Sequence, residues 1–208
     1  MGGTALAHRA LTNLASADLV AACATGDRLA LGELFERFSG PVYRFLSRLV
    51  GAQKESLDDL VQATFLQVLQ SAAKYRQEAA VQTWIFAIAA NVVRHHCRSE
   101  GRRRSLLQRA EFQTQEPARC PTREVERRLL LGQLLDALPT LPPDLRTAFV
   151  MCEVEEIPGP EVARSLNWPE GTLWRRLHEA RQLLRQQLND EGQKPRPVPT
   201  LRFATVLG

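Results

Sequence analysis

Residues 160–188 read PEVARSLNWPEGTLWRRLHEARQLLRQQL, and this stretch predicts two helices joined by a tight turn. The turn is expected at Asn167-Trp168-Pro169, because asparagine tolerates unusual backbone angles and the residue before a proline avoids the helical region. Apolar residues recur at steps of three and four, which places them on the inner face of each helix. The inner residues are Val162, Ala163 and Leu166 in the first helix and Leu173, Leu177, Ala180, Leu184 and Leu188 in the second.

The outer face of the second helix is basic. It presents Trp174, Arg175, His178, Gln182 and Arg185, with Arg176 and Arg181 at its flanks. A hairpin with such a face can insert its second helix into the major groove of DNA. An ordinary helical hairpin with a solvated arginine face gives the same pattern, so this stretch alone leaves both interpretations open.

Charge is distributed unevenly along the 208 residues. The net charge of +4 is small, and a content of 44% hydrophobic and 24% charged residues predicts packed globular structure. Residues 91–110 hold six arginines against one glutamate, whereas residues 140–169 hold five acidic and two basic side chains. Positive charge is thus concentrated in a mid-chain block and on the last long helix, which suits contact with phosphates at two places.

Neither a metal site nor secretion is indicated by the cysteine and histidine pattern. The cysteines are Cys23, Cys97, Cys120 and Cys152, with no C-x-x-C pair. In His95-His96-Cys97, adjacent side chains point about 100° apart on a helix, so they cannot all reach one ion. The N-terminus lacks a signal-peptide arrangement, and the apolar run 84–90 is far shorter than the roughly 18 residues of a membrane helix. We therefore expect a reduced, cytoplasmic protein with no metal, no cofactor and no membrane insertion.

Helical periodicity without strand-like alternation predicts an all-α fold. Helices are expected before the hairpin at about 18–24, 29–38, 42–50, 56–73, 84–98, 124–138 and 143–154. Gly40-Pro41 is expected to separate the second helix from the third. The segment 99–124 is polar and arginine-rich and contains two prolines, which indicates a linker.

These features predict two small helical domains joined by a basic linker, with the C-terminal domain a helix-turn-helix. The expected order is a flexible arm (1–16), a first helical domain (17–100), the linker (101–126), the helix-turn-helix domain (127–189) and a flexible tail (190–208). The tail is expected to be flexible because it holds three prolines and lies at a terminus.

The outer face of the expected helix 56–73 is unusual. Opposite the core stripe it carries Asp59, Gln62, Ala63, Leu66 and Gln70. A leucine flanked by amides and a carboxylate suits a docking surface, although a single exposed leucine is also normal on a monomer.

The expected helix 84–98 is apolar around most of its circumference. Its one polar strip contains Asn91, Arg94, His95 and Arg98, which suits contact with a polyanion. The preceding loop, 74–83, combines basic, aromatic and amide side chains, as a pocket for an unstacked base requires. A surface loop anchored in the core by Tyr75 would have the same composition.

Three blocks of this sequence resemble the extracytoplasmic-function (ECF) type of bacterial sigma factor in order and spacing. They are DDLVQATFLQVL (58–69), YRQEAAVQTWIFAIAANVVR (75–94) and LPPDLRTAFVMCEVEEIPGPEVARSLNWPEGTLWRRLHEARQLL (141–184). The resemblance covers about residues 17–105 and 127–188. It implies a promoter-specificity subunit, not an enzyme, that binds core RNA polymerase through the β′ coiled coil and the β subunit. It also implies promoter DNA and an anti-sigma factor as partners. The rival interpretation is a stand-alone dimeric helix-turn-helix regulator.

The resemblance assigns three groups of residues. Polymerase docking falls on Asp58, Asp59, Gln62 and Leu66. Reading and melting of the −10 promoter element falls on Tyr75, Arg76, Trp84, Asn91, Arg94, His95 and Arg98. Reading of the −35 element falls on Thr172, Trp174, Arg175, Arg176, His178 and Arg181. The chain departs from the family pattern at Ala63, Val81, His95, Trp174 and Arg175, so the promoter sequence is not transferred from relatives.

Overall fold

The computed structural model describes residues 11, 13–50, 57–106 and 132–193, and every regular element in these ranges is helical. The predicted all-α fold is therefore confirmed. Most of the predicted arm, linker and tail lies outside the described residues. No helix in the described ranges is both long enough and apolar enough to cross a membrane.

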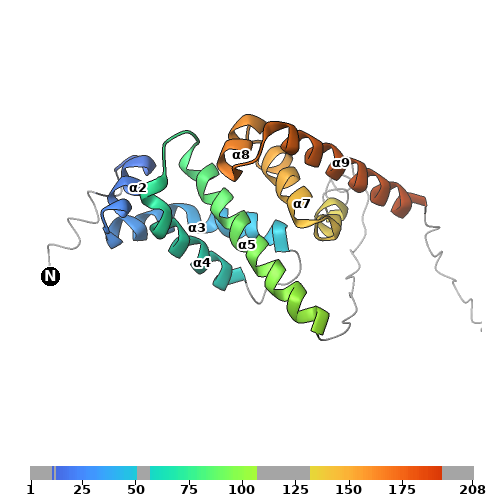
Figure 1. The fold of residues 1–208 in the computed structure, drawn as a ribbon, viewed down its shortest axis with the longest axis horizontal. Coiled ribbons are helices and arrows are strands. Elements are labelled where there is room, and N and C mark those ends of the chain that lie inside the picture. Colours follow the sequence, from blue (N-terminus) through green and yellow to red (C-terminus); the bar gives the residue numbers. More distant parts are fainter. Residues whose placement is uncertain (1–10, 12, 51–56, 107–131, 194–208) are drawn as a thin grey trace, which may run out of the picture.

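The N-terminal half is a helical bundle (Figure 1). It consists of α2 (Ser16–Ala24), α3 (Arg28–Val50), α4 (Leu57–Ser71), the 3-10 turn η2 (Ala72–Lys74) and α5 (Val81–Leu106). Aromatic pairs join the helices through the core. Phe45 of α3 stacks on Phe86 of α5 with ring centroids 4.4 Å apart, and Phe35 of α3 meets Phe65 of α4 at 4.9 Å.

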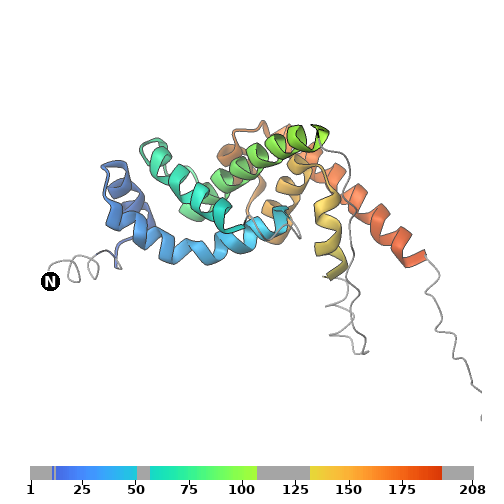
Figure 2. The ribbon, with the colours of Figure 1, turned by 90° about the horizontal axis from the view of Figure 1, so that it is seen from below.

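α3 is one continuous helix, so the predicted break at Gly40-Pro41 is wrong. Pro41 has no N–H to donate to the carbonyl of Arg37, and a proline inside a helix costs about 3 kcal/mol. Leu34 before the proline and Phe45 after it are both fully buried. Burying each such side chain stabilises the fold by about 1.5–3 kcal/mol. Packing on both sides of Pro41 therefore outweighs its cost, and α3 accommodates it in a curved course (Figure 2).

The C-terminal half contains the predicted hairpin. Its elements are η3 (Leu138–Thr140), α7 (Pro143–Phe149), the π-helical turn η4 (Val150–Val154), α8 (Gly159–Leu166) and α9 (Glu170–Gln193). The inner residues of the hairpin are buried as predicted, except that Leu188 is only half-buried. Asn167 forms the turn in the left-handed conformation, with φ of +53°, and the Trp168 N–H donates to the Ala163 carbonyl at 2.8 Å.

The two halves pack directly on each other, a contact that the sequence did not predict. α7 and α8 lie against α3 and α5 (Figures 1 and 2). Arg146 of α7 is buried, and its guanidinium donates to the Leu49 carbonyl in the last turn of α3 and to the Leu141 carbonyl. The last carbonyls of a helix have no partner within the helix, so Arg146 caps α3 from the other half. Burial lowers the pKa of the Arg146 guanidinium.

Candidate nucleic-acid interface

The outer face of α9 is exposed along most of its length. Arg175, His178 and Arg181 are exposed, whereas Thr172 and Arg176 are half-buried. Arg181 pairs with Glu153 of η4 across the flank of the hairpin. Arg175 and His178 lie in the first turns of α9. Both side chains are exposed, and neither forms an ion pair within the part of the chain that the structure describes.

Trp174 has a packing role that the sequence did not reveal. Its side chain is 48% exposed, and its ring lies over the backbone of Gly159, the first residue of α8. A Cβ atom at position 159 would meet this ring at 2.5 Å, which is closer than real Cβ contacts come. Gly159 and Trp174 thus join the start of α8 to the start of α9. The glycine at the head of the hairpin was a signal in the sequence, but its partner was not visible there.

The polar strip predicted on the fifth helix is present on α5. Asn91 and Arg94 are half-buried and His95 is exposed. The Asn91 Oδ1 accepts a hydrogen bond from Arg94 Nη1 at 3.2 Å, so the two side chains are held together. The Arg98 side chain lies outside the described residues. We call Asn91, Arg94, His95 and Arg98 the reading strip.

The loop before α5, residues 75–80, is fixed by Tyr75. The Tyr75 hydroxyl donates to the Ala79 carbonyl at 2.8 Å, and its ring contacts Trp84 with centroids 5.0 Å apart. Burial, and then the nearby Glu161 carboxylate, raise the pKa of the Tyr75 hydroxyl. Arg76 is exposed beside this aromatic pair. Tyr75 therefore anchors the loop, in agreement with the simpler of the two interpretations of its composition.

The structure brings one residue of each predicted DNA-reading group together on Asp144 of α7. Arg94 Nε lies 3.0 Å from Asp144 Oδ1, and Arg176 Nη2 lies 2.7 Å from Asp144 Oδ2. Both guanidinium groups also lie over the ring of Trp168, at 5.3 Å for Arg94 and 4.0 Å for Arg176. We call these four residues the Asp144 cluster. Sequence reasoning missed Asp144 and Trp168; the excess of acid in 140–169 was the only signal.

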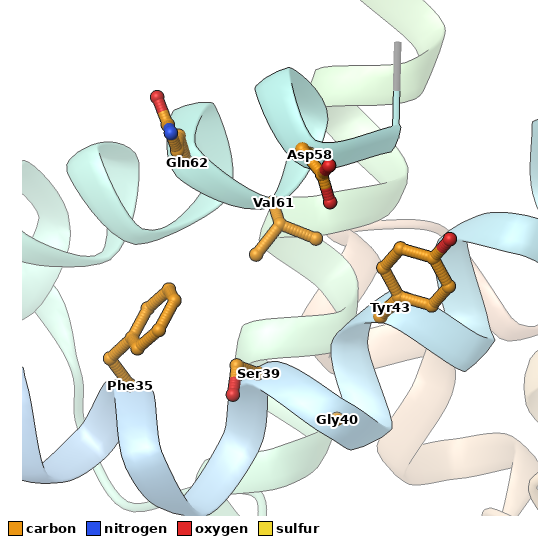
Figure 3. Close-up of a pocket in the computed structure, with 7 residues that line it drawn as sticks. All are labelled: Phe35, Ser39, Gly40, Tyr43, Asp58, Val61 and Gln62. Carbon is orange, nitrogen blue, oxygen red and sulfur yellow. The ribbon is translucent and has the colours of Figure 1, made fainter. Parts of the chain in front are cut away.

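The predicted docking residues lie on the exposed face of α4. Asp58, Asp59, Gln62 and Leu66 are all exposed, Leu66 by 60%. We call these four residues the docking face. Beside them, a groove of about 450 Å³ runs between α3 and α4 (Figure 3). The rings of Phe35 and Tyr43 lie on either side of Val61 in this groove, and both are partly exposed. The sequence did not single out these two rings as part of this surface.

Metal binding finds no support in the arrangement of side chains. No three His, Cys, Asp or Glu residues are grouped to hold an ion anywhere in the described ranges. The expected absence of a cofactor stays a prediction.

Comparison with known proteins identifies the family. The chain matches Sigma-70 region 2 over residues 34–103 and Sigma-70, region 4 over residues 131–184. It is 34% identical to the ECF RNA polymerase sigma factor SigE of Mycolicibacterium smegmatis over 170 residues, which cover 79% of this chain and 65% of that protein. It is 31% identical to the ECF RNA polymerase sigma factor SigM of Mycobacterium tuberculosis over 173 residues, which cover 83% of this chain and 84% of that protein.

A solved structure shares the fold. The sigma factor RpoE from Bartonella quintana, in a co-crystal structure with the anti-sigma factor NepR, is similar with a TM-score of 0.59 and 20% sequence identity. The similarity covers 76% of this chain and 96% of that chain. With both sigma regions matched in order, and with SigM matched over most of its length, the chain belongs to the ECF RNA polymerase sigma factors, the promoter-specificity subunits of RNA polymerase.

Proposed function

We propose that this chain directs transcription initiation by docking on core RNA polymerase through α4 while α5 and α9 read two promoter elements. The observation that carries the proposal is the separation of the surfaces. The docking face lies on α4, whereas the basic reading residues lie on α5 and α9 (Figure 1). One molecule can thus contact polymerase and DNA at the same time. The chain needs no catalytic group of its own for this role, and we place it in the cytoplasm.

The chemistry of the docking face supports a protein partner. Interfaces generally combine a few apolar anchors with a polar rim. Leu66 supplies an exposed anchor, the groove beside it exposes the Phe35 and Tyr43 rings, and Asp58 and Asp59 add negative charge. These features fit a basic, partly apolar helical surface such as the β′ coiled coil of polymerase, with the β subunit as a further contact.

We assign the −10 element to the reading strip and the loop before it. Arginine side chains such as Arg94 and Arg98 suit phosphates, and the Asn91 amide can both donate to and accept from a base edge. The Tyr75–Trp84 pair with exposed Arg76 offers the stacking surface and positive charge that an unpaired base requires. His95 lies exposed at the same strip.

We assign the −35 element to α9. The N-terminal turns of a recognition helix enter the major groove, where arginine pairs with guanine and phosphate. Thr172, Arg175, Arg176, His178 and Arg181 are the proposed contacts. Trp174, which packs on Gly159, would meet DNA only with the exposed half of its ring.

The proposed domain order follows the surfaces, with residues 17–100 for docking and the −10 element and 127–189 for the −35 element. We also propose an anti-sigma factor as a partner, because the structurally similar RpoE is seen with NepR. The arm (1–16), linker (101–126) and tail (190–208) complete the proposed organisation.

Run-off transcription tests the proposed function. Core polymerase with the purified chain is expected to transcribe specific fragments of a genomic promoter library that core polymerase alone does not transcribe. The variant Leu66→Glu is expected to abolish these transcripts, because it puts charge at the centre of the docking face. Gln67→Ala, at an exposed position of α4 that is not assigned to docking, is the matched control and is expected to leave them unchanged.

Two results would contradict the proposal. One is the absence of any chain-dependent transcript from the library. The other is tight, dimeric binding of the free chain to duplex DNA with no requirement for polymerase, which would favour the stand-alone regulator.

A further inference from the structure

Each of the two proposed DNA-reading surfaces has one arginine that pairs with the same carboxylate. Arg94 belongs to the reading strip of α5 and Arg176 to α9, yet both pair with the one carboxylate of Asp144. Each carboxylate oxygen takes one arginine, at 3.0 Å and 2.7 Å. A carboxylate offers arginine much the same planar pair of acceptors as a phosphate does. Asp144 therefore occupies both arginines in the manner in which DNA phosphates would.

Burial in the Asp144 cluster limits what the arginines can reach. The side chains of Arg94 and Arg176 are only 20% and 22% exposed. Trp168 lies against both guanidinium groups, which adds a cation–π attraction to each ion pair. Arg94 Nη2 is buried with no hydrogen-bond partner among the described groups. In this arrangement Arg94 is thus sequestered without satisfying all of its donors.

A second acidic side chain of the C-terminal half contacts the loop before α5. Glu161 of α8 accepts a hydrogen bond from the Ala80 N–H at 3.1 Å. The same carboxylate lies near Tyr75, the anchor of the loop. A third contact, the ion pair of Glu155 with Arg48 of α3, joins the same two halves. Three of the five acidic side chains of residues 140–169, Asp144, Glu155 and Glu161, thus contact the N-terminal half.

The docking face lies away from this contact. The C-terminal helices lie against α3 and α5, and α4 lies on the other side of α5 from α8 (Figure 1). The described arrangement therefore sequesters one arginine of each DNA-reading surface, Arg94 and Arg176, while it leaves the docking face exposed.

We propose that Asp144 and Glu161 form an intramolecular latch that, in the free chain, withholds Arg94, Arg176 and the loop before α5 from DNA and leaves the docking face open for polymerase. The latch rests on the proposed function, because that function assigns Arg94 and Arg176 to DNA. The apparent affinity of a ligand that binds only the open state is its intrinsic affinity multiplied by the fraction of molecules that are open. Core polymerase, by holding the two halves apart, would remove this penalty and so couple docking to DNA reading.

Hydrogen–deuterium exchange of the full chain tests the latch. The double variant Asp144→Asn with Glu161→Ala removes both acidic contacts from the C-terminal half. The matched control, Asp136→Asn with Glu156→Ala, makes the same change of charge at two exposed positions of that half. Exchange is read in the peptide covering residues 75–83, which belongs to the other half. We expect exchange about fivefold faster in the latch variant than in the control, because its open population is larger.

DNA binding supplies the second readout. The probe is a fluorescein-labelled single strand of 20 random nucleotides at fixed salt, and binding is followed by anisotropy without polymerase. The latch variant is expected to bind about fivefold more tightly than the wild-type chain and the control. Adding Arg94→Ala to the latch variant is expected to remove the gain. If Asp144 only positioned Arg176 for DNA, the latch variant would bind more weakly, and that result would overturn the proposal.

The remaining outcomes separate the latch from the proposed function. Unchanged exchange in a latch variant that melts as a folded protein would overturn the latch, and so would faster exchange without tighter DNA binding. Run-off transcription by the wild-type chain decides the proposed function independently. A chain that transcribes but shows neither effect loses only the latch, whereas a chain that fails to transcribe loses the proposed function whatever its exchange rates.

Discussion

The docking face and the Asp144 cluster present charged side chains in opposite ways. On α4, acidic residues and Leu66 are exposed, and the helix packs mainly against α3 and α5 of its own half. In the Asp144 cluster, arginines of α5 and α9 are drawn inward onto a carboxylate and a tryptophan ring. The same small fold therefore leaves the docking face exposed and keeps one arginine of each DNA-reading surface paired with Asp144. Exposure, and not residue type alone, thus separates a surface that is available in the free chain from side chains that must first be released.

Arg146 joins the two halves, and its replacement should lower the free energy of unfolding more than any other change considered below. Replacing Arg146 by alanine removes its hydrogen bonds to the Leu49 and Leu141 carbonyls and leaves those buried groups unpaired. We expect the free energy of unfolding to fall by about 3 kcal/mol, the upper range for a bond to a charged group. Urea denaturation measures it, with Arg164→Ala at an exposed position of α8 as the control. Equal midpoints for the two variants would show that the closed arrangement does not depend on this contact.

The second prediction concerns the docking face. Leu66→Ala is expected to weaken binding to core polymerase by about 2 kcal/mol, or roughly thirtyfold, as is typical of a central apolar anchor. Because the side chain is 60% exposed, the thermal midpoint is expected to stay within the range of other surface variants. Titration of labelled chain with core polymerase checks this. Undiminished affinity would remove Leu66 from the docking face.

A third prediction concerns the hairpin that presents the −35 residues. Gly159→Ala is expected to destabilise the chain by about 2 kcal/mol, because the new methyl group overlaps the Trp174 ring. Combining it with Trp174→Ala removes the overlap, so the double variant should be less destabilised than the sum of the two single variants. Thermal or urea denaturation of the three variants completes the cycle. If the two destabilisations simply added, the Trp174 ring would move aside at little cost, and it would not fix α8 on α9.

The smallest expected effect is on stability at the reading strip. The Asn91 side chain is half-buried and accepts one hydrogen bond, from Arg94. Asn91→Ala is expected to change unfolding by at most about 0.5–1.5 kcal/mol, the range for one hydrogen bond. It should instead change which −10 sequences are transcribed, as selection from a randomised promoter library would reveal. Loss of folding in this variant would make Asn91 a core residue.

Sequence patterns predicted the local features of this fold well. The inner stripes of α8 and α9, the turn at Asn167 and the exposed face of α4 follow from helical periodicity and backbone preference, which act over a few residues. The break predicted at Pro41 was wrong because burial on both sides of the proline overrode its local preference. The π-helical turn after Phe149, where an α-helix was expected to continue, also had no local signal.

The contacts between the two halves could not be predicted from these local patterns. Arg94 and Asp144 are far apart in the sequence, and Arg146 reaches the end of a helix in the other half. Such pairs depend on how the halves pack, which no short window of sequence encodes. The proposed reading residues were chosen by family resemblance and residue type, so their engagement with Asp144 and Trp168 was not foreseen. Only the charge asymmetry between 91–110 and 140–169 pointed towards it.

The most direct test measures the affinity of one promoter duplex for two forms of the protein. The duplex is a fragment selected by the reconstituted holoenzyme, and its affinity is measured at the same salt concentration for the free chain and for the chain bound to core polymerase. We predict that the duplex binds at least about a hundredfold more tightly to the chain on polymerase, after the affinity of core polymerase alone is subtracted, because docking uses the exposed face and releases Arg94 and Arg176 from Asp144. Equal affinity of the free chain and the holoenzyme for this duplex would contradict it.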